Sequence, residues 1–82
     1  MFKKGEFMLN IFILPTCPYC KKVIDYLKTT NLKYKLLDID DTHYYDELIQ
    51  LGGKRQVPFL FDNDKNVMMY ESDDIIEYLK TL

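Results

Sequence analysis

The most informative segment of the chain is residues 8–20, MLNIFILPTCPYC. It joins a nearly unbroken apolar run, residues 8–14, to a cysteine pair through Pro15, which has no backbone N–H for a continuing strand. An apolar run of this length is typical of a strand buried on both faces, as in a parallel sheet. The segment therefore predicts a central strand that ends just before two cysteines.

The residues that follow predict a helix and a second strand. Pro18 suits the first helical position, and the apolar residues after it recur at helical spacing to about Thr30. These apolar residues are Cys20, Val23, Ile24 and Leu27. Residues 33–40 alternate with one change of phase, as a two-sided or a bulged strand would. The three elements form a βαβ unit, for which a right-handed crossover is the default.

The second half of the chain predicts a helix, a hairpin and a last helix. Asp41 or Thr42 can cap the first of these helices, which Gly52-Gly53 would end. Residues 57–70 contain two short apolar runs around a turn-rich centre, which indicates an antiparallel hairpin. Ser72 is expected to cap the last helix. The predicted order is βαβ, α, ββα in one domain, residues 8–82.

Composition sets the broad class of the protein. Its 82 residues are 48% hydrophobic and 29% charged, which is typical of a single globular domain. A net charge of -2 argues against nucleic-acid binding, because phosphate contacts need a clustered basic surface. The pairs Lys3-Lys4, Lys21-Lys22 and Lys54-Arg55 are interpreted as solvated.

The N-terminal residues are interpreted as an extension rather than a targeting signal. Residues 1–7 precede the domain, and Met8 is an alternative start. Glu6 and Asn10 interrupt the apolar stretch that imitates a signal peptide. No apolar run approaches the ~20 residues needed to span a bilayer. We therefore expect no membrane contact.

The two cysteines lie in one tetrapeptide, Cys17-Pro18-Tyr19-Cys20. Two cysteines cannot build the disulfide framework of a small secreted domain, so we expect a reducing, cytoplasmic compartment and a reactive pair. A helix start stabilises a thiolate, which makes Cys17 the expected nucleophile. Cys20, one turn further on the apolar face, is expected to stay protonated and to resolve the mixed disulfide.

Two other interpretations of the cysteines are a zinc half-site and a buried inert pair. Zinc takes four ligands, and besides the cysteines the chain offers only His43 and scattered carboxylates, so no metal site is predicted. His43 is interpreted as a surface residue of the second helix.

These motifs resemble those of glutaredoxins. Residues 16–20 look like the dithiol active site of that family, and Val57-Pro58 looks like the Val-Pro pair that thioredoxin-fold proteins place opposite it. Residues 56–58 and 70–73 are also similar to the N-terminal domain of glutathione S-transferases, which shares the fold. The resemblance covers about residues 8–82. It implies an α/β, thioredoxin-like fold with a four-stranded mixed sheet and three helices.

The resemblance also implies a site for glutathione. It implies a cis Pro58, a Val57 main chain that pairs with the cysteinyl main chain of glutathione, and a Ser72 that holds the γ-glutamyl carboxylate. Asp73 or Glu71 would pair with the amine. Contacts are further implied for Tyr19, Gln56 and Arg55, the last with the glycyl carboxylate. Without the family, Ser72 is an ordinary cap, Asp73 a partner of the helix dipole, Tyr19 an exposed ring and Arg55 a solvated cation.

The implied activity is the reduction of protein or glutathione mixed disulfides, with glutathione as co-substrate and no bound cofactor. Expected partners are client proteins with disulfides and a flavoprotein disulfide reductase, with the protein itself a monomer. Three alternatives are a glutathione-independent redoxin reduced by a thioredoxin reductase, an iron-sulfur module that uses Cys17 and glutathione, and a minimal glutathione transferase. Two departures from the glutaredoxin pattern weaken the implied glutathione contacts: Leu14 replaces a cation, and Tyr70-Glu71 replaces a Gly-Gly pair.

Overall fold

The structure is a computed structural model that describes residues 9–82. The extension predicted for residues 1–7, and Met8, lie outside the described residues. The elements follow one another in the predicted order, βαβ, α, ββα. They are β1 (Leu9–Ile13), α1 (Pro18–Leu27), β2 (Tyr34–Asp38), α2 (Thr42–Gly52), β3 (Phe59–Asp62), β4 (Val67–Tyr70) and α3 (Ser72–Leu79).

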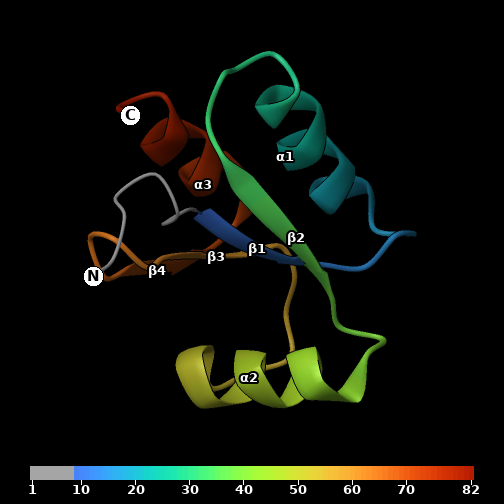
Figure 1. The fold of residues 1–82 in the computed structure, drawn as a ribbon. Coiled ribbons are helices and arrows are strands. Elements are labelled where there is room, and N and C mark those ends of the chain that lie inside the picture. Colours follow the sequence, from blue (N-terminus) through green and yellow to red (C-terminus); the bar gives the residue numbers. More distant parts are fainter. Residues whose placement is uncertain (1–8) are drawn as a thin grey trace.

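The four strands form one mixed sheet in the order β2-β1-β3-β4. β1 pairs in parallel with β2 and antiparallel with β3, and β4 pairs antiparallel with β3. Helices α1 and α3 cover one face of this sheet and α2 covers the other (Figure 1). The predicted architecture, a four-stranded mixed sheet between three helices, is confirmed.

The central strand β1 is buried on both faces, as its apolar sequence predicts. Ile11 and Ile13 belong to a core shared with α1 and α3, whereas Phe12 belongs to a second core beneath α2. Successive side chains of a strand point to opposite faces, so one apolar run supplies both cores. This double anchoring fixes the end of β1, where the loop that carries the cysteines begins.

Strand β2 is two-sided rather than bulged. Its register with β1 continues without a break from Leu9 paired with Tyr34 to Ile13 paired with Asp38. Tyr34 packs against the core under α1 and α3, and Leu37 is buried in the core under α2. The change of phase in the sequence therefore reflects apolar residues on both faces.

Helix α1 ends at Leu27, earlier than the predicted Thr30. The hydroxyls of Thr29 and Thr30 donate to the carbonyls of Tyr26 and Leu27, at 2.7 and 2.8 Å, and their backbone N–H groups bond to the same two carbonyls. Bonds to the residue three back form a tight final turn in place of another helical turn.

Helix α2 has the boundaries that its sequence predicts. Asp41 is the N-cap, and its carboxylate accepts a hydrogen bond from the backbone N–H of His43 at 2.9 Å. Gly53 ends the helix with a φ of 88°, in the left-handed region that glycine tolerates. Among the helices of residues 9–82, none is long and apolar enough to cross a membrane.

Helix α3 begins differently from the prediction. Glu71 is the N-cap, its side chain makes no capping hydrogen bond, and Ser72 is the first helical residue. The chain passes from β4 into α3 at Glu71, which takes a φ of 75°. The expectation that Ser72 caps this helix is therefore wrong, because the turn places the non-helical residue one position earlier.

Candidate active site

Cys17 occupies the N-cap of α1 and is half-buried. Its backbone N–H donates to the carbonyl of Leu14 at 3.1 Å, which closes the turn after β1. Its Sγ accepts a hydrogen bond from the backbone N–H of Cys20 at 3.4 Å. N–H groups at the N-terminus of a helix favour negative charge on the atom that they face. Cys17 therefore combines access for a substrate with a site suited to negative charge.

Cys20 lies one turn further along α1 and is fully buried. It packs in the core with Val23, Leu27 and Ile75. Burial, opposed by a backbone hydrogen bond at Leu14 and reinforced by the neighbouring Cys17, raises the pKa of the Cys20 thiol from 9.0 to about 12. Cys17 is thus half-buried and Cys20 fully buried, whereas their roles as nucleophile and resolving thiol stay predictions.

The loop before β3 lies directly opposite the cysteines. The thiol of Cys17 contacts the carbonyl of Val57, with 3.9 Å between Sγ and the oxygen. The Val57-Pro58 peptide bond is cis, as the resemblance implies. Residues 40 positions apart in the chain thus meet at the thiol.

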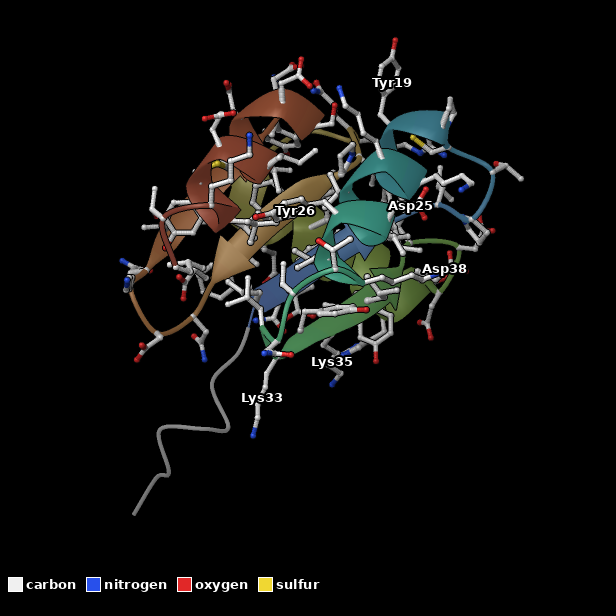
Figure 2. The ribbon with its side chains drawn as sticks, turned by 90° about the horizontal axis from the view of Figure 1, so that it is seen from above. Tyr19, Asp25, Tyr26, Lys33, Lys35 and Asp38 are labelled. Carbon is white, nitrogen blue, oxygen red and sulfur yellow. The ribbon has the colours of Figure 1, made fainter. Side chains whose placement is uncertain are left out.

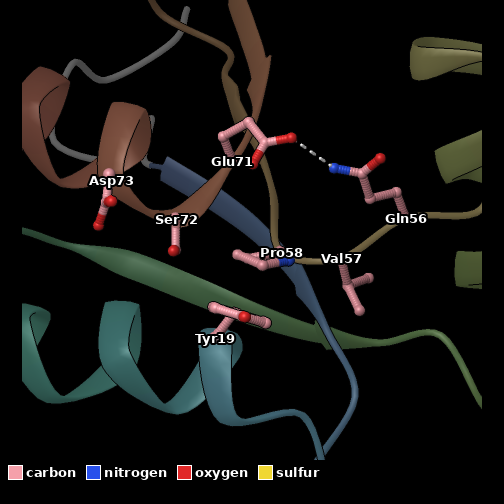
Figure 3. A pocket seen from close by; sticks show the side chains of 7 residues that line it. All are labelled: Tyr19, Gln56, Val57, Pro58, Glu71, Ser72 and Asp73. Carbon is pink, nitrogen blue, oxygen red and sulfur yellow. Dashed lines mark hydrogen bonds between the residues drawn. The ribbon is translucent and has the colours of Figure 1, made fainter.

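A groove with a volume of about 400 Å³ begins beside this contact. Figure 3 shows that it is lined from three segments: the start of α1, the loop before β3 and the start of α3. The lining residues are Tyr19, Gln56, Val57, Pro58, Glu71, Ser72 and Asp73. These are seven of the eight residues that the resemblance assigns to glutathione. The eighth, Arg55, is exposed and lies outside this lining.

Tyr19 forms one side of the groove and remains largely exposed. Its side chain extends outward from the start of α1 (Figure 2) and is 64% exposed. An aromatic ring in this position offers apolar surface to a bound molecule without needing to be buried in the free protein. Tyr19 is therefore an exposed ring that also lines the groove, and its contact with glutathione stays a prediction.

Two polar contacts cross the rim of the groove. The Gln56 amide donates from Nε2 to Oε2 of Glu71 at 3.1 Å (Figure 3). The Lys22 ammonium pairs with the Asp73 carboxylate and so joins α1 to α3. The sequence predicts a solvated Lys22 and gives no sign of this contact, because its partner lies 51 residues away in the chain.

The backbone of Glu71 leads to a prediction about stability. A non-glycine residue at a φ of 75° costs ~1–3 kcal/mol, whereas glycine adopts this conformation without strain. Glycine also adds ~0.5–1 kcal/mol of entropic cost on folding. We expect Glu71→Gly to raise the free energy of unfolding by about 1 kcal/mol in urea denaturation.

The matched control for this variant is Glu77→Gly. Glu77 is an exposed residue in the interior of α3, where glycine should lower the free energy of unfolding by about 1 kcal/mol. A loss of stability in Glu71→Gly comparable to that of the control would show that the backbone at Glu71 is not strained.

The next feature is the arrangement of possible metal ligands in the described part of the chain. Among residues 9–82, no group of three or more His, Cys, Asp or Glu side chains is arranged to hold one. His43 is exposed on α2, which covers the face of the sheet opposite α1 (Figure 1). It lines a shallow depression with Asp46, Glu47 and Gln50, apart from the cysteines.

Comparisons with known proteins agree with this geometry. The sequence profile of the glutathione S-transferase N-terminal domain family matches residues 11–82. A glutaredoxin-like 8.6 kDa protein from the rubredoxin operon of Clostridium pasteurianum is 33% identical over an alignment of 75 residues that covers 85% of this chain and 99% of that protein. Glutaredoxin-1 of Bos taurus is 33% identical over 88% of this chain and 81% of its own length.

The fold is shared with a solved glutaredoxin. The glutaredoxin of Archaeoglobus fulgidus superposes with a TM-score of 0.70 at 23% identity, over 93% of this chain and 89% of the other. With its sheet topology, its cysteine pair and these relatives, the chain belongs to the glutaredoxin-like family of thioredoxin-fold thiol-disulfide oxidoreductases.

Proposed function

We propose that the protein is a dithiol glutaredoxin that reduces protein disulfides and glutathione mixed disulfides with electrons from glutathione. The observation that carries this proposal is the groove beside Cys17, which is lined by seven residues that the glutaredoxin resemblance assigns to glutathione. Val57 links the groove to the thiol, because it lines the groove and its carbonyl contacts Sγ of Cys17.

The proposed reaction on a glutathione mixed disulfide uses Cys17 alone. The Cys17 thiolate attacks the glutathionyl sulfur, the client disulfide bond breaks, and the client leaves as a thiolate that takes up a proton. A second glutathione thiolate then attacks the glutathionyl sulfur on Cys17. This step forms glutathione disulfide and regenerates the Cys17 thiolate, so that the incoming glutathione sulfur is oxidised while the client sulfur is reduced.

A protein disulfide would use both cysteines. Cys17 attacks one client sulfur, and Cys20 then attacks Cys17 in the mixed disulfide. This second attack releases the reduced client and leaves a Cys17-Cys20 disulfide, which two glutathione molecules reduce. The burial of Cys20 beneath Cys17 supports this division, because the resolving thiol needs to reach only its neighbour.

We place glutathione along the groove as an extended peptide. Its cysteinyl main chain pairs with that of Val57, in the manner of an added strand. Its γ-glutamyl carboxylate meets Ser72 and the N-terminus of α3, and its amine meets Glu71 or Asp73. Tyr19, Gln56 and Pro58 provide the remaining walls, and Arg55 is available to a glycyl carboxylate that extends beyond the groove.

The decisive test is turnover of a glutathione mixed disulfide with glutathione as the only reductant. The proposal predicts saturable turnover at millimolar glutathione. The competing function is a redoxin that accepts electrons from a flavoprotein reductase of the thioredoxin type. It is favoured by Leu14, a half-buried apolar residue where many glutaredoxins have a cation. Reduction of the Cys17-Cys20 disulfide by such a reductase, with none by glutathione, would establish that alternative.

Ser72→Ala tests the γ-glutamyl contact. We expect the KM for glutathione to rise about tenfold or more, because losing one hydrogen bond to a charged group costs about 1.5–3 kcal/mol, with little change in kcat. The free energy of unfolding should stay within about 0.5 kcal/mol of the original value, because Glu71 and not Ser72 is the cap of α3. Steady-state kinetics measures the KM, and urea denaturation measures the free energy of unfolding.

Thr42→Ala is the control for Ser72→Ala. Thr42 is the first residue of α2, as Ser72 is of α3, but α2 lies on the other face of the sheet. The control should leave the KM unchanged. An unchanged KM in Ser72→Ala as well would exclude Ser72 from the glutathione site.

A further inference from the structure

Tyr70, the last residue of β4, holds a loop residue by both of its backbone groups. The Tyr70 hydroxyl donates to the carbonyl of Lys54 at 2.7 Å and accepts from the backbone N–H of Lys54 at 3.3 Å. The Lys54 ammonium lies 4.8 Å from the centre of the Tyr70 ring. One side chain thereby fixes the first part of the loop that leads from α2 to β3.

The position of the ring is itself fixed by close packing. Tyr70 packs against Phe59, with 4.6 Å between the ring centroids, and Phe59 packs against Phe12 in the core. Gly52 also lies against the ring, because a Cβ added there would come within 2.2 Å of the hydroxyl oxygen. The glycine at position 52 is therefore required by the approach of Tyr70, whereas Gly53 serves to end α2.

The loop held by Tyr70 is one wall of the groove. Two residues after Lys54 comes Gln56, which begins the wall and donates to Glu71, the residue after Tyr70. Adjacent residues of one segment, Tyr70 and Glu71, thus hold two positions of the loop, Lys54 and Gln56. The second wall of the groove starts at the same Glu71. These hydrogen bonds set the separation of the two walls.

We propose that Tyr70 is a positioning residue: its hydroxyl holds the loop at Lys54, keeps the Gln56–Pro58 wall at a fixed distance from the α3 wall, and so raises the affinity of the groove for glutathione. The proposal rests on the proposed function of the groove. Its physical basis is preorganisation, because a wall that is already ordered loses less conformational freedom when a peptide binds. Lys54 and Arg55 are exposed, so the core does not order this part of the loop.

Tyr70→Phe is the direct test, because it keeps the ring on Phe59 and removes both hydrogen bonds. We expect the KM for glutathione to rise about three- to tenfold with kcat within about twofold, since the hydroxyl orders a binding surface and does not touch the reacting sulfur. Backbone 15N relaxation should show lower order parameters at residues 54–57. Gly52→Ala should also raise the KM for glutathione and lower the order parameters at residues 54–57, because its methyl group displaces the Tyr70 ring.

Tyr44→Phe is the matched control. Tyr44 is a half-buried tyrosine on α2 that packs against the same core. Loss of its hydroxyl should change neither the KM for glutathione nor the order parameters at residues 54–57. Unchanged order parameters at residues 54–57 in Tyr70→Phe would overturn the proposal, and so would lower order parameters with an unchanged KM. Absence of glutathione turnover in the original protein would instead reject the function of the groove. In that case, lower order parameters at residues 54–57 in Tyr70→Phe would still show that the Tyr70 hydroxyl orders the loop.

Discussion

Cys17→Ser is expected to abolish every disulfide-exchange reaction of the protein. Cys17 is the cysteine at the helix start that is open to a substrate, and its sulfur lies at the groove. A serine hydroxyl cannot replace it, because it does not ionise at neutral pH and forms no disulfide. Turnover of glutathione mixed disulfides and of protein disulfides should both fall to the rate without enzyme.

Cys20→Ser separates the two reactions. Serine cannot resolve a mixed disulfide, so reduction of protein disulfides should be lost. Turnover of glutathione mixed disulfides should persist, because in that reaction a second glutathione discharges Cys17. If Cys20→Ser were inactive on glutathione mixed disulfides while Cys17→Ser kept activity, the roles of the two cysteines would be reversed.

The parts of the fold that the sequence predicts are those with a local cause. The apolar run of β1 has no polar alternation, and the structure buries it between two cores. The cysteine pair is placed by two neighbouring signals, the end of that run and the proline at the helix start. Both signals depend only on residues adjacent in the chain, so they can be interpreted without tertiary information.

The start of α3 shows where local preference fails. Serine is a favoured cap and glutamate is not, so residue type alone predicts Ser72. The structure moves the cap to Glu71 because the chain must turn from β4 into α3, and that turn imposes a φ that glutamate rarely adopts. Many glutaredoxins have a Gly-Gly pair here, and the position of Glu71 is one where glycine would fit without strain.

The residues that the sequence analysis missed act through distant partners. Lys22 contacts Asp73 and Tyr70 contacts Lys54, across 51 and 16 residues of chain. Gly52 and Gly53 are indistinguishable in the sequence as a signal for the end of a helix. In the structure only Gly53 takes a positive φ, while Gly52 makes room for the Tyr70 ring. Such roles depend on which segments the fold brings together, and no local pattern contains that information.

Cys20 is expected to resist alkylation in the native protein. In Cys17→Ser, where Cys20 is the remaining cysteine, iodoacetamide at about pH 8 should react at least ~100-fold more slowly than in urea-unfolded protein. The side chain is fully buried, and burial is the largest cause that raises the pKa of Cys20, so it continues to act in Cys17→Ser after the contributions of Cys17 are lost. Each unit by which burial holds the pKa above 9.0 lowers the ionised fraction at pH 8 about tenfold. Mass spectrometry of the adduct against time measures both rates.

The pH dependence distinguishes ionisation of Cys20 from simple lack of access. A raised pKa means that the thiol keeps its proton to higher pH, so the 13Cβ shift of labelled Cys20 should stay constant through about pH 10 and change only above it. If burial blocked access without raising the pKa, the shift would titrate near the free value of about 8.5.

The same protonation should govern how the two reactions respond to pH. Cys20 must lose its proton to attack the mixed disulfide on Cys17, and each unit of pH below its pKa raises its thiolate fraction about tenfold. In the mixed disulfide Cys17 is no longer a thiolate, which lowers the pKa of Cys20. Burial, the largest cause of the raised pKa, remains. Above about pH 9, where the glutathione thiol is already ionised, reduction of protein disulfides should therefore continue to accelerate, whereas turnover of glutathione mixed disulfides, which does not need Cys20, should level off. Parallel pH profiles for the two reactions would show that resolution by Cys20 does not limit the dithiol route.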